Sequence, residues 1–301
     1  MNLNRIFFSP DGSRLRAGWR LGIQTFVLLG FGICISIPIF VVIFTFDPTI
    51  ITTLQLEPEH LLLATLGETI AITVSVFLAR RFLDKQPIES LGLKLNIQAL
   101  FDVFAGVGIT FLQMGLIYLL MSILGWLTFE GFAWEVDPIG LVLKNIMLFF
   151  VTFILVGWNE ELLSRGYHLQ TIANGTNLLW GVIISSVVFG LLHIANPGAN
   201  FASTVGIILA GIFLAYGYVR TKQLWLSIGL HLGWNFFEGV VFGFPVSGLD
   251  IYTLTRIKVT GPDLWTGGVF GPEAGLIVLP SLVMGGILIY WFTKKRGHSI
   301  K

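Results

Sequence analysis

The chain has 301 residues, of which 54% are hydrophobic and only 12% are charged, and its mean hydropathy is +0.83. Soluble domains carry about 25% charged residues, so this composition excludes a soluble globular domain. A formal net charge of +1 leaves no overall basic field of the kind that attracts nucleic acid. The single cysteine, Cys34, lies inside an apolar run, which excludes a disulfide framework and favours a buried structural thiol.

Eight apolar stretches of 18 to 32 residues follow along the chain, and a transmembrane helix needs roughly 20 residues. They are residues 21–46, 60–79, 101–127, 141–172, 178–195, 200–219, 224–244 and 274–293. The first is longer than the roughly 7–15 apolar residues of a signal-peptide core, so we interpret it as a retained membrane helix behind a cytoplasmic segment, residues 1–20. The fourth is too long to be only a span, and we expect its last turns to leave the hydrocarbon or to bend near Gly166. Residues 21–301 are therefore expected to form one all-α domain, a polytopic bundle of about eight transmembrane helices.

Basic residues gather in alternate connections, and cytoplasmic loops of membrane proteins carry an excess of Lys and Arg. They occupy the N-terminal segment, the connection around residues 80–94, the connection around residues 220–222 and the C-terminal tail. The connections at 47–59 and 129–140 hold acidic residues and no Lys or Arg. This alternation predicts an integral membrane protein with both termini in the cytoplasm and residues 245–272 outside. In a bacterium, the membrane would be the inner (plasma) membrane.

The sixth stretch carries small residues at helical spacing. In GIILAGIFLAYGY, Gly206 and Ala210 are four residues apart, as are Gly211 and Ala215. Such pairs let helix backbones approach each other closely in lipid. We therefore expect this face to pack against a neighbouring segment.

The fourth stretch ends with three ionisable residues, Glu160, Glu161 and Arg165. Ionisable residues inside a membrane cost about 2.5–3.5 kcal/mol each on insertion scales and are functional candidates by default. Glu161 and Arg165 are four residues apart, so they share a helix face and can neutralise each other. Glu160 is turned about 100° away from Glu161 and has no partner nearby in the sequence. An unpaired carboxylate in a dry site takes up a proton or binds a ligand, which suits a general base.

Two further helices bring polar residues to similar depth. Phe189 and His193 end the fifth stretch, and His231 and Asn235 lie near the start of the seventh, each pair at a spacing of four residues. With a rise of about 1.5 Å per residue, Glu160 and both histidines can reach a common level inside the bilayer. We therefore expect an intramembrane polar site.

These residues carry a resemblance. EELLSR (Glu160, Glu161, Arg165), FGLLH (Phe189, His193) and HLGWN (His231, Asn235) resemble the motifs EExxxR, FxxxH and HxxxN/D, in the same order, of the CPBP family of intramembrane proteases. That family includes the CAAX prenyl endopeptidases and bacterial proteins linked to bacteriocin processing and self-immunity. The likeness covers about residues 140–240, and RRFLDKQPIESLGL, after the second stretch, also resembles the family's cytoplasmic connection.

The resemblance implies an eight-helix fold and an endopeptidase that acts on peptides or membrane proteins within the lipid bilayer. By position, Glu160 would activate water and His193 would help to hold it. His231 and Asn235 would polarise the scissile carbonyl or stabilise its oxyanion. The supporting residues would be Glu161, Arg165 and, as a wall of the pocket, Phe189.

The dependence on a metal stays open. Two histidines and a carboxylate can bind Zn²⁺, so Zn²⁺ held by Glu160, His193, His231 and Asn235 is one possibility. The sequence contains no HExxH motif, and a metal-free glutamate mechanism uses the same residues.

Two other functions remain alternatives, a non-catalytic membrane scaffold or immunity factor and a proton-coupled transporter. Transporters often have repeated halves or paired broken helices, whereas these polar residues are confined to 160–235. Glu68 is the main polar residue outside the motifs. It either packs against the site or binds a polar neighbour, and a structural role is the interpretation that we favour.

Overall fold

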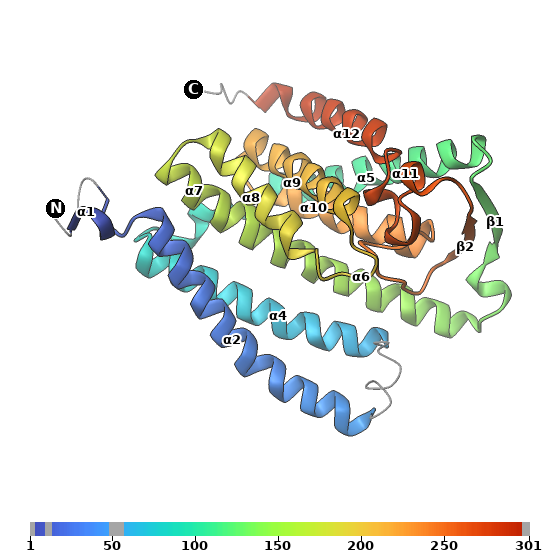
Figure 1. The fold of residues 1–301 in the computed structure, drawn as a ribbon, viewed down its shortest axis with the longest axis horizontal. Helices are drawn as coiled ribbons and strands as arrows, with labels where there is room; N and C mark the ends of the chain where they lie inside the picture. Colours follow the sequence, from blue (N-terminus) through green and yellow to red (C-terminus); the bar gives the residue numbers. More distant parts are fainter. Residues whose placement is uncertain (1–3, 10–13, 48–56, 297–301) are drawn as a thin grey trace.

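Each of the eight predicted spans is helical in the computed structural model, which describes residues 4–9, 14–47 and 57–296 (Figure 1). The spans are α2 (Ala17–Phe46), α4 (Pro58–Leu78) with the π-helical η1 (Ala79–Leu83), α5 (Ile97–Ile123), α6 (Ile139–Glu161), α8 (Leu178–Leu192), α9 (Phe201–Thr221), α10 (Trp225–Asn235) with the π-helical η5 (Phe236–Val241), and α12 (Val278–Thr293). Within the described residues, five helical segments, which begin with α2, α4, α5, α6 and α9, are long and apolar enough to cross a membrane. The predicted all-α membrane bundle is therefore confirmed, with α8, α10 and α12 as shorter helices.

The fourth span changes its helical geometry where the polar residues lie. After α6 the chain continues through the π-helical η4 (Leu162–Leu169) into α7 (Gln170–Gly175), and the whole segment has 37 residues. The irregularity expected near Gly166 is thus a π segment that starts directly after Glu160 and Glu161. Such segments are rare and occur often at functional sites.

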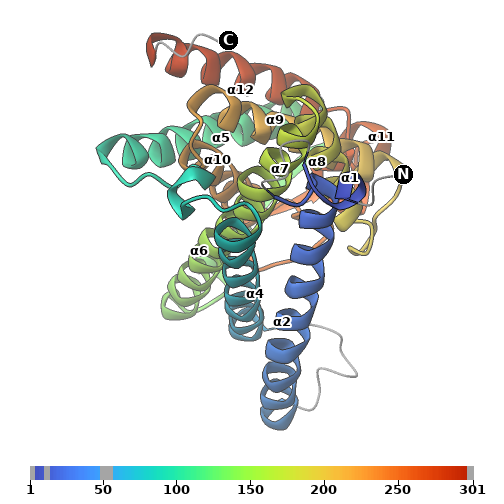
Figure 2. The ribbon, with the colours of Figure 1, turned by 90° about the vertical axis from the view of Figure 1, so that its left-hand side faces the viewer.

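Helix α2 lies at the edge of the bundle, where it runs alongside α4 (Figures 1 and 2). Only 6% of its apolar window is buried. Cys34 is exposed on this helix, so the prediction of a buried thiol is wrong. The physical reason is that α2 has few neighbours besides α4, which leaves most of its surface free to face lipid.

Helix α10 is buried along nearly its whole length, from Leu226 to Asn235. Its contact with α5 depends on glycine, because a Cβ on Gly229 would meet the Val103 carbonyl oxygen at 2.3 Å and one on Gly106 would meet the Leu230 nitrogen at 2.4 Å. These close approaches place α10, with its His and Asn, in the centre of the bundle.

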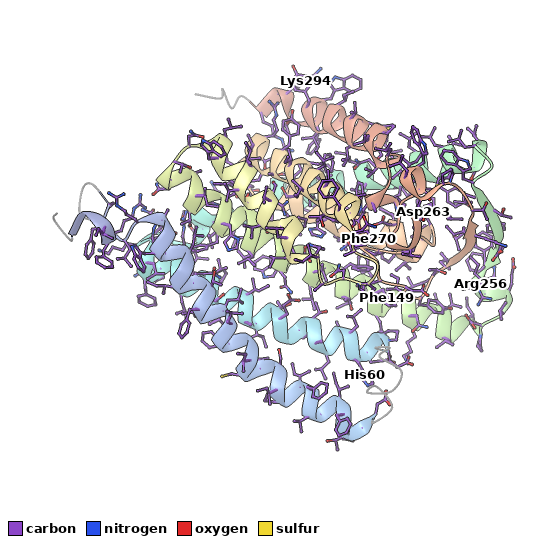
Figure 3. The ribbon with its side chains drawn as sticks, viewed as in Figure 1. His60, Phe149, Arg256, Asp263, Phe270 and Lys294 are labelled. Atoms are coloured by element: carbon purple, nitrogen blue, oxygen red, sulfur yellow. The ribbon has the colours of Figure 1, made fainter. Side chains whose placement is uncertain are left out.

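The basic connections meet at one end of the bundle. Arg20 forms an ion pair with Asp84, Arg80 bonds the same carboxylate at 2.9 Å, and Arg220 donates to Thr293 at 2.8 Å. Short helices complete this end: α1 (Asn4–Phe7), η2 (Ile88–Leu91) and η8 (Lys294–Arg296). Lys294 lies here, far from Arg256 at the opposite end (Figure 3).

A two-stranded antiparallel sheet closes the opposite end (Figure 1). β1 (Leu127–Phe132) pairs with β2 (Thr255–Val259), with Leu127 opposite Val259 and a bulge between Phe129 and Gly131. The sequence analysis missed this sheet and extended the third span to residue 127, whereas α5 ends at Ile123. Short helices also form here: η3 (Ala133–Glu135), α11 (Asp263–Thr266), η6 (Gly268–Phe270) and η7 (Pro272–Ala274). The predictions for residues 48–56 and 297–301 lie outside the described residues.

Candidate active site

Glu161 and Arg165 form a fully buried ion pair. Oxygen Oε1 of Glu161 accepts hydrogen bonds from Arg165 Nη1 at 2.8 Å and from His231 Nδ1 at 2.9 Å. The other guanidinium nitrogen, Nη2, donates to the Gly211 carbonyl oxygen at 2.7 Å, and the guanidinium carbon lies 4.5 Å from the centre of the Phe189 ring. The pair therefore links α6 and η4 to α8, α9 and α10.

Glu160 faces a cavity of about 740 Å³ that residues of α2, α4, α6, α8, α9 and α10 line. The predicted site residues that line this cavity are Glu160, Phe189, His193, His231 and Asn235. Glu161 and Arg165 are not among the lining residues, since they lie behind the cavity wall. The structure thus separates the two adjacent glutamates as the spacing of their neighbours indicated.

Both histidines direct their Nε2 atoms toward Glu160. Oxygen Oε2 of Glu160 is 3.8 Å from Nε2 of His193 and 3.7 Å from Nε2 of His231. These separations are too long for hydrogen bonds. In the part of the chain that the structure describes, Glu160 Oε2 is buried and has no hydrogen-bond partner. The gap suits a small polar group between the carboxylate and the two rings.

The other ring nitrogens hold the histidines in place. His193 follows the last residue of α8, and its Nδ1 lies 2.8 Å from the carbonyl oxygen of Phe189. Because a carbonyl oxygen only accepts, Nδ1 donates the hydrogen, and Nε2 of the neutral ring keeps a free lone pair. The FxxxH spacing therefore contributes a backbone acceptor as well as the Phe189 ring, which lies 4.9 Å from the His193 ring between centroids.

The donor set for a metal is only partly assembled. Two imidazole nitrogens and a carboxylate oxygen are ligands that Zn²⁺ accepts, and here they converge. As the side chains stand, no group of three His, Cys, Asp or Glu residues within the described ranges is arranged to hold a metal ion.

Sequence reasoning missed two residues at the site, Glu273 and Ser247. Glu273 lines the cavity and accepts hydrogen bonds from Trp234 Nε1 at 3.0 Å and from the backbone nitrogen and hydroxyl of Ser247 at 2.9 and 2.6 Å. These bonds hold the loop before α12 against α10. The available signal was a lone acidic residue in the Gly- and Pro-containing FGPEAG, directly before the last apolar stretch.

Known proteins resemble part of this chain. The family model described as type II CAAX prenyl endopeptidase Rce1-like matches residues 142–237. The protein printed as "Uncharacterized protein YyaK" of Bacillus subtilis (strain 168) is 32% identical over 152 residues, 45% of this chain and 44% of that protein. "Putative membrane peptidase YdiL" of the same organism is 28% identical over 130 residues, 43% of this chain and 49% of that protein. A "UPF0756 membrane protein" of Lactiplantibacillus plantarum is 28% identical over 141 residues, 47% of this chain and 86% of that protein.

The matches to the two Bacillus proteins span about half of their lengths. No solved structure matches the chain at a significant level. The family match nevertheless contains all three motifs, which α6 with η4, α8 with its C-cap, and α10 present around one cavity. The resemblance to the CPBP family is confirmed, and it rests on residues 142–237, the part of the chain that the Rce1-like family model matches.

Proposed function

We propose that this chain is an intramembrane endopeptidase that hydrolyses peptide bonds of membrane-associated proteins or peptides. The observation that carries the proposal is the convergence of Glu160 Oε2 with the Nε2 atoms of His193 and His231 at 3.7–3.8 Å inside a cavity. A carboxylate without a partner next to two positioned imidazoles is an arrangement that can activate water. The match to a membrane-endopeptidase family supports the same reaction.

Glu160 is the proposed general base. A water molecule between Glu160 Oε2 and His193 Nε2, which are 3.8 Å apart, can donate one hydrogen to each at ordinary hydrogen-bond lengths. Its oxygen lone pair then faces the cavity. Glu160 takes a proton as the water oxygen bonds to the carbonyl carbon, and the protonated carboxyl gives that proton to the leaving amine nitrogen when the C–N bond breaks.

Asn235 and His231 are the proposed donors to the developing oxyanion. Both line the cavity with Glu160. The amide of Asn235 can donate directly, and a protonated His231 can donate from Nε2 while Nδ1 donates to Glu161. In that form the Glu161 carboxylate balances the charge of the ring, which gives the buried pair with Arg165 a second role. Preorganised donors of this kind stabilise the charge that develops during acyl transfer.

A bound Zn²⁺ would be held by Glu160, His193 and His231, with Asn235 next to them, and would act as a Lewis acid. The proposed steps use only the side chains. They predict that adding a chelator leaves the cleavage rate unchanged, and activity that chelator and Zn²⁺ switch off and on would show that the metal-free mechanism is wrong.

Comparing membrane-protein fragments tests the proposed function in cells. Cells that express the chain are expected to contain new protein N-termini that are absent from cells expressing Glu160→Ala at equal abundance. A proton-coupled transporter or a non-catalytic scaffold would give the same set of N-termini in both, and that result would reject the endopeptidase.

A further inference from the structure

Glu68 faces the cavity from α4. Leu61, Thr65, Glu68 and Ile72 all line the cavity, and their spacing of four, three and four residues places them on one face of the helix. Glu68 is also close enough to Glu160 to interact with it electrostatically. The carboxylate for which a structural role was favoured from the sequence therefore points at the proposed reaction centre.

The cavity supplies no fixed positive charge to Glu68. Its lining includes the carboxylates of Glu68, Glu160 and Glu273 but no Lys or Arg. Glu273 is occupied by donors from Trp234 and Ser247, and the buried Arg165 is bonded to Glu161 behind the wall. Within the described residues Glu68 makes no ion pair, so its charge is available to a ligand.

Asn159 is a polar neighbour of Glu68. This side chain is fully buried, and it interacts with the Glu68 carboxylate by hydrogen bonding. Buried polar groups in folded proteins are nearly always hydrogen-bonded. Asn159 does not line the cavity, so it can help to hold the Glu68 carboxylate, which is the group that a cation in the cavity would meet.

We infer that Glu68 forms a subsite for a basic side chain, Lys or Arg, of the substrate segment close to the bond that is cleaved. The inference rests on the proposed endopeptidase function and names its substrate class. A cation enters a cavity that holds a carboxylate without a counter-ion more favourably than a neutral group of the same size, because the mutual attraction offsets the loss of its hydration. Glu68 is then a specificity-determining residue and not a catalytic one.

Cleavage of paired peptides tests this subsite. The purified chain is incubated with a library of N-acetylated apolar peptides in which one position near the centre holds either Lys or norleucine, and products are counted by mass spectrometry. Acetylation excludes the peptide's own terminal amine as the cation. Wild type is expected to prefer Lys, and Glu68→Gln is expected to lower the Lys-to-norleucine cleavage ratio by roughly 10–100-fold. Glu68→Asp should keep the preference in part, and Glu68→Lys should turn it toward acidic residues.

The ratio is measured within one sample of protein, so it does not depend on how much of a variant folds. Glu89→Gln, at an exposed position of η2, is the matched control and should leave the ratio unchanged. A wild type without preference for Lys, or a preference that survives Glu68→Gln, overturns the inference while the endopeptidase stands. Wild-type products identical to those of Glu160→Gln would reject the proposed function itself, and the inference with it.

Discussion

Glu160 and Glu161 are neighbours in sequence but have opposite surroundings. The side chain of Glu160 is 29% exposed and faces the cavity, whereas that of Glu161 is fully buried and bonded to Arg165 and His231. A helix turns by about 100° between adjacent residues, which is enough to place one carboxylate in the cavity and the other behind its wall. The two residues should therefore respond differently to the same substitution.

Glu161→Gln should reduce the amount of folded protein as well as activity. The substitution leaves the Arg165 guanidinium buried without its counter-ion, and breaking a buried pair costs about 3–5 kcal/mol. Fluorescence-detected gel filtration of detergent extracts measures the folded fraction. The double variant Glu161→Gln with Arg165→Gln removes both charges and should recover abundance more than turnover. Normal abundance of Glu161→Gln alone would show that the pair does not hold the bundle together.

At the scale of elements, the small residues of α9 allow the loop before α12 to reach the site. A Cβ on Gly206 would lie 1.8 Å from the carbonyl oxygen of Glu273, and one on Gly211 would lie 3.1 Å from the Ser186 Cβ. The spacing of small residues predicted close packing on this face. It did not predict that the short η7, rather than a membrane helix, would be the neighbour at Gly206.

Gly206→Ala should lower thermal stability. The added methyl must displace the backbone at Glu273, and overpacking of this kind costs about 1–3 kcal/mol, more than the roughly 1 kcal/mol that Ala gains over Gly in a helix. Gly30→Ala in α2 is the control, because nothing lies within 4 Å of its added Cβ. The midpoint of thermal unfolding in detergent should fall for Gly206→Ala only, and equal midpoints would contradict the packing described for α9.

The helices were predictable from the sequence and the sheet was not, for a physical reason. Every span is a local apolar run long enough to be read directly, so all eight were found. β1 and β2 have only six and five residues. Their pairing joins two segments that are separated in the sequence by the helices from α6 to α10. The glycine at position 125 was a signal in the sequence for the end of α5. Gly125 adopts φ +71°, a conformation that favours glycine and ends a helix.

At the scale of the molecule, the distribution of charge and the contacts between connections agree. The basic connections contact one another. For example, the backbone nitrogen of Lys94 donates to the Gln223 side chain, directly after residues 220–222, at 3.0 Å. The opposite end joins β1 to β2 and links Asp137 to Arg256 at 3.3 Å. Since membrane proteins keep excess Lys and Arg in the cytoplasm, we propose that the first end is cytoplasmic.

Reporter fusions test this orientation. A reporter that is active only in the cytoplasm should be active when fused after Lys301 and inactive when inserted next to Asp250, in the loop that precedes β2. A second reporter, active only outside the cytoplasm, should give the reverse pattern. The same signal at both positions would mean that the chain crosses the membrane an even number of times between them, which would contradict α12 as a single span.

The motif residues could be located from the sequence because each pair lies within one helical turn. Their convergence depends on how α6, α8 and α10 pack, whereas only their similar depth could be predicted from the helix rise. Glu273 and Asn159 escaped notice for the same reason. Their importance comes from neighbours in the fold, since one bonds Ser247 and Trp234 and the other lies next to Glu68.

Cleavage by the purified Glu160→Gln variant tests the central claim most directly. The amide keeps the shape of the side chain but cannot accept the proton from water, so kcat should fall by roughly 10²–10⁴-fold, the usual loss of general-base catalysis. The amount of folded protein should match wild type, because Glu160 makes no hydrogen bond through Oε2 within the described structure. Near-normal cleavage by folded Glu160→Gln would contradict the assignment of Glu160 as the base.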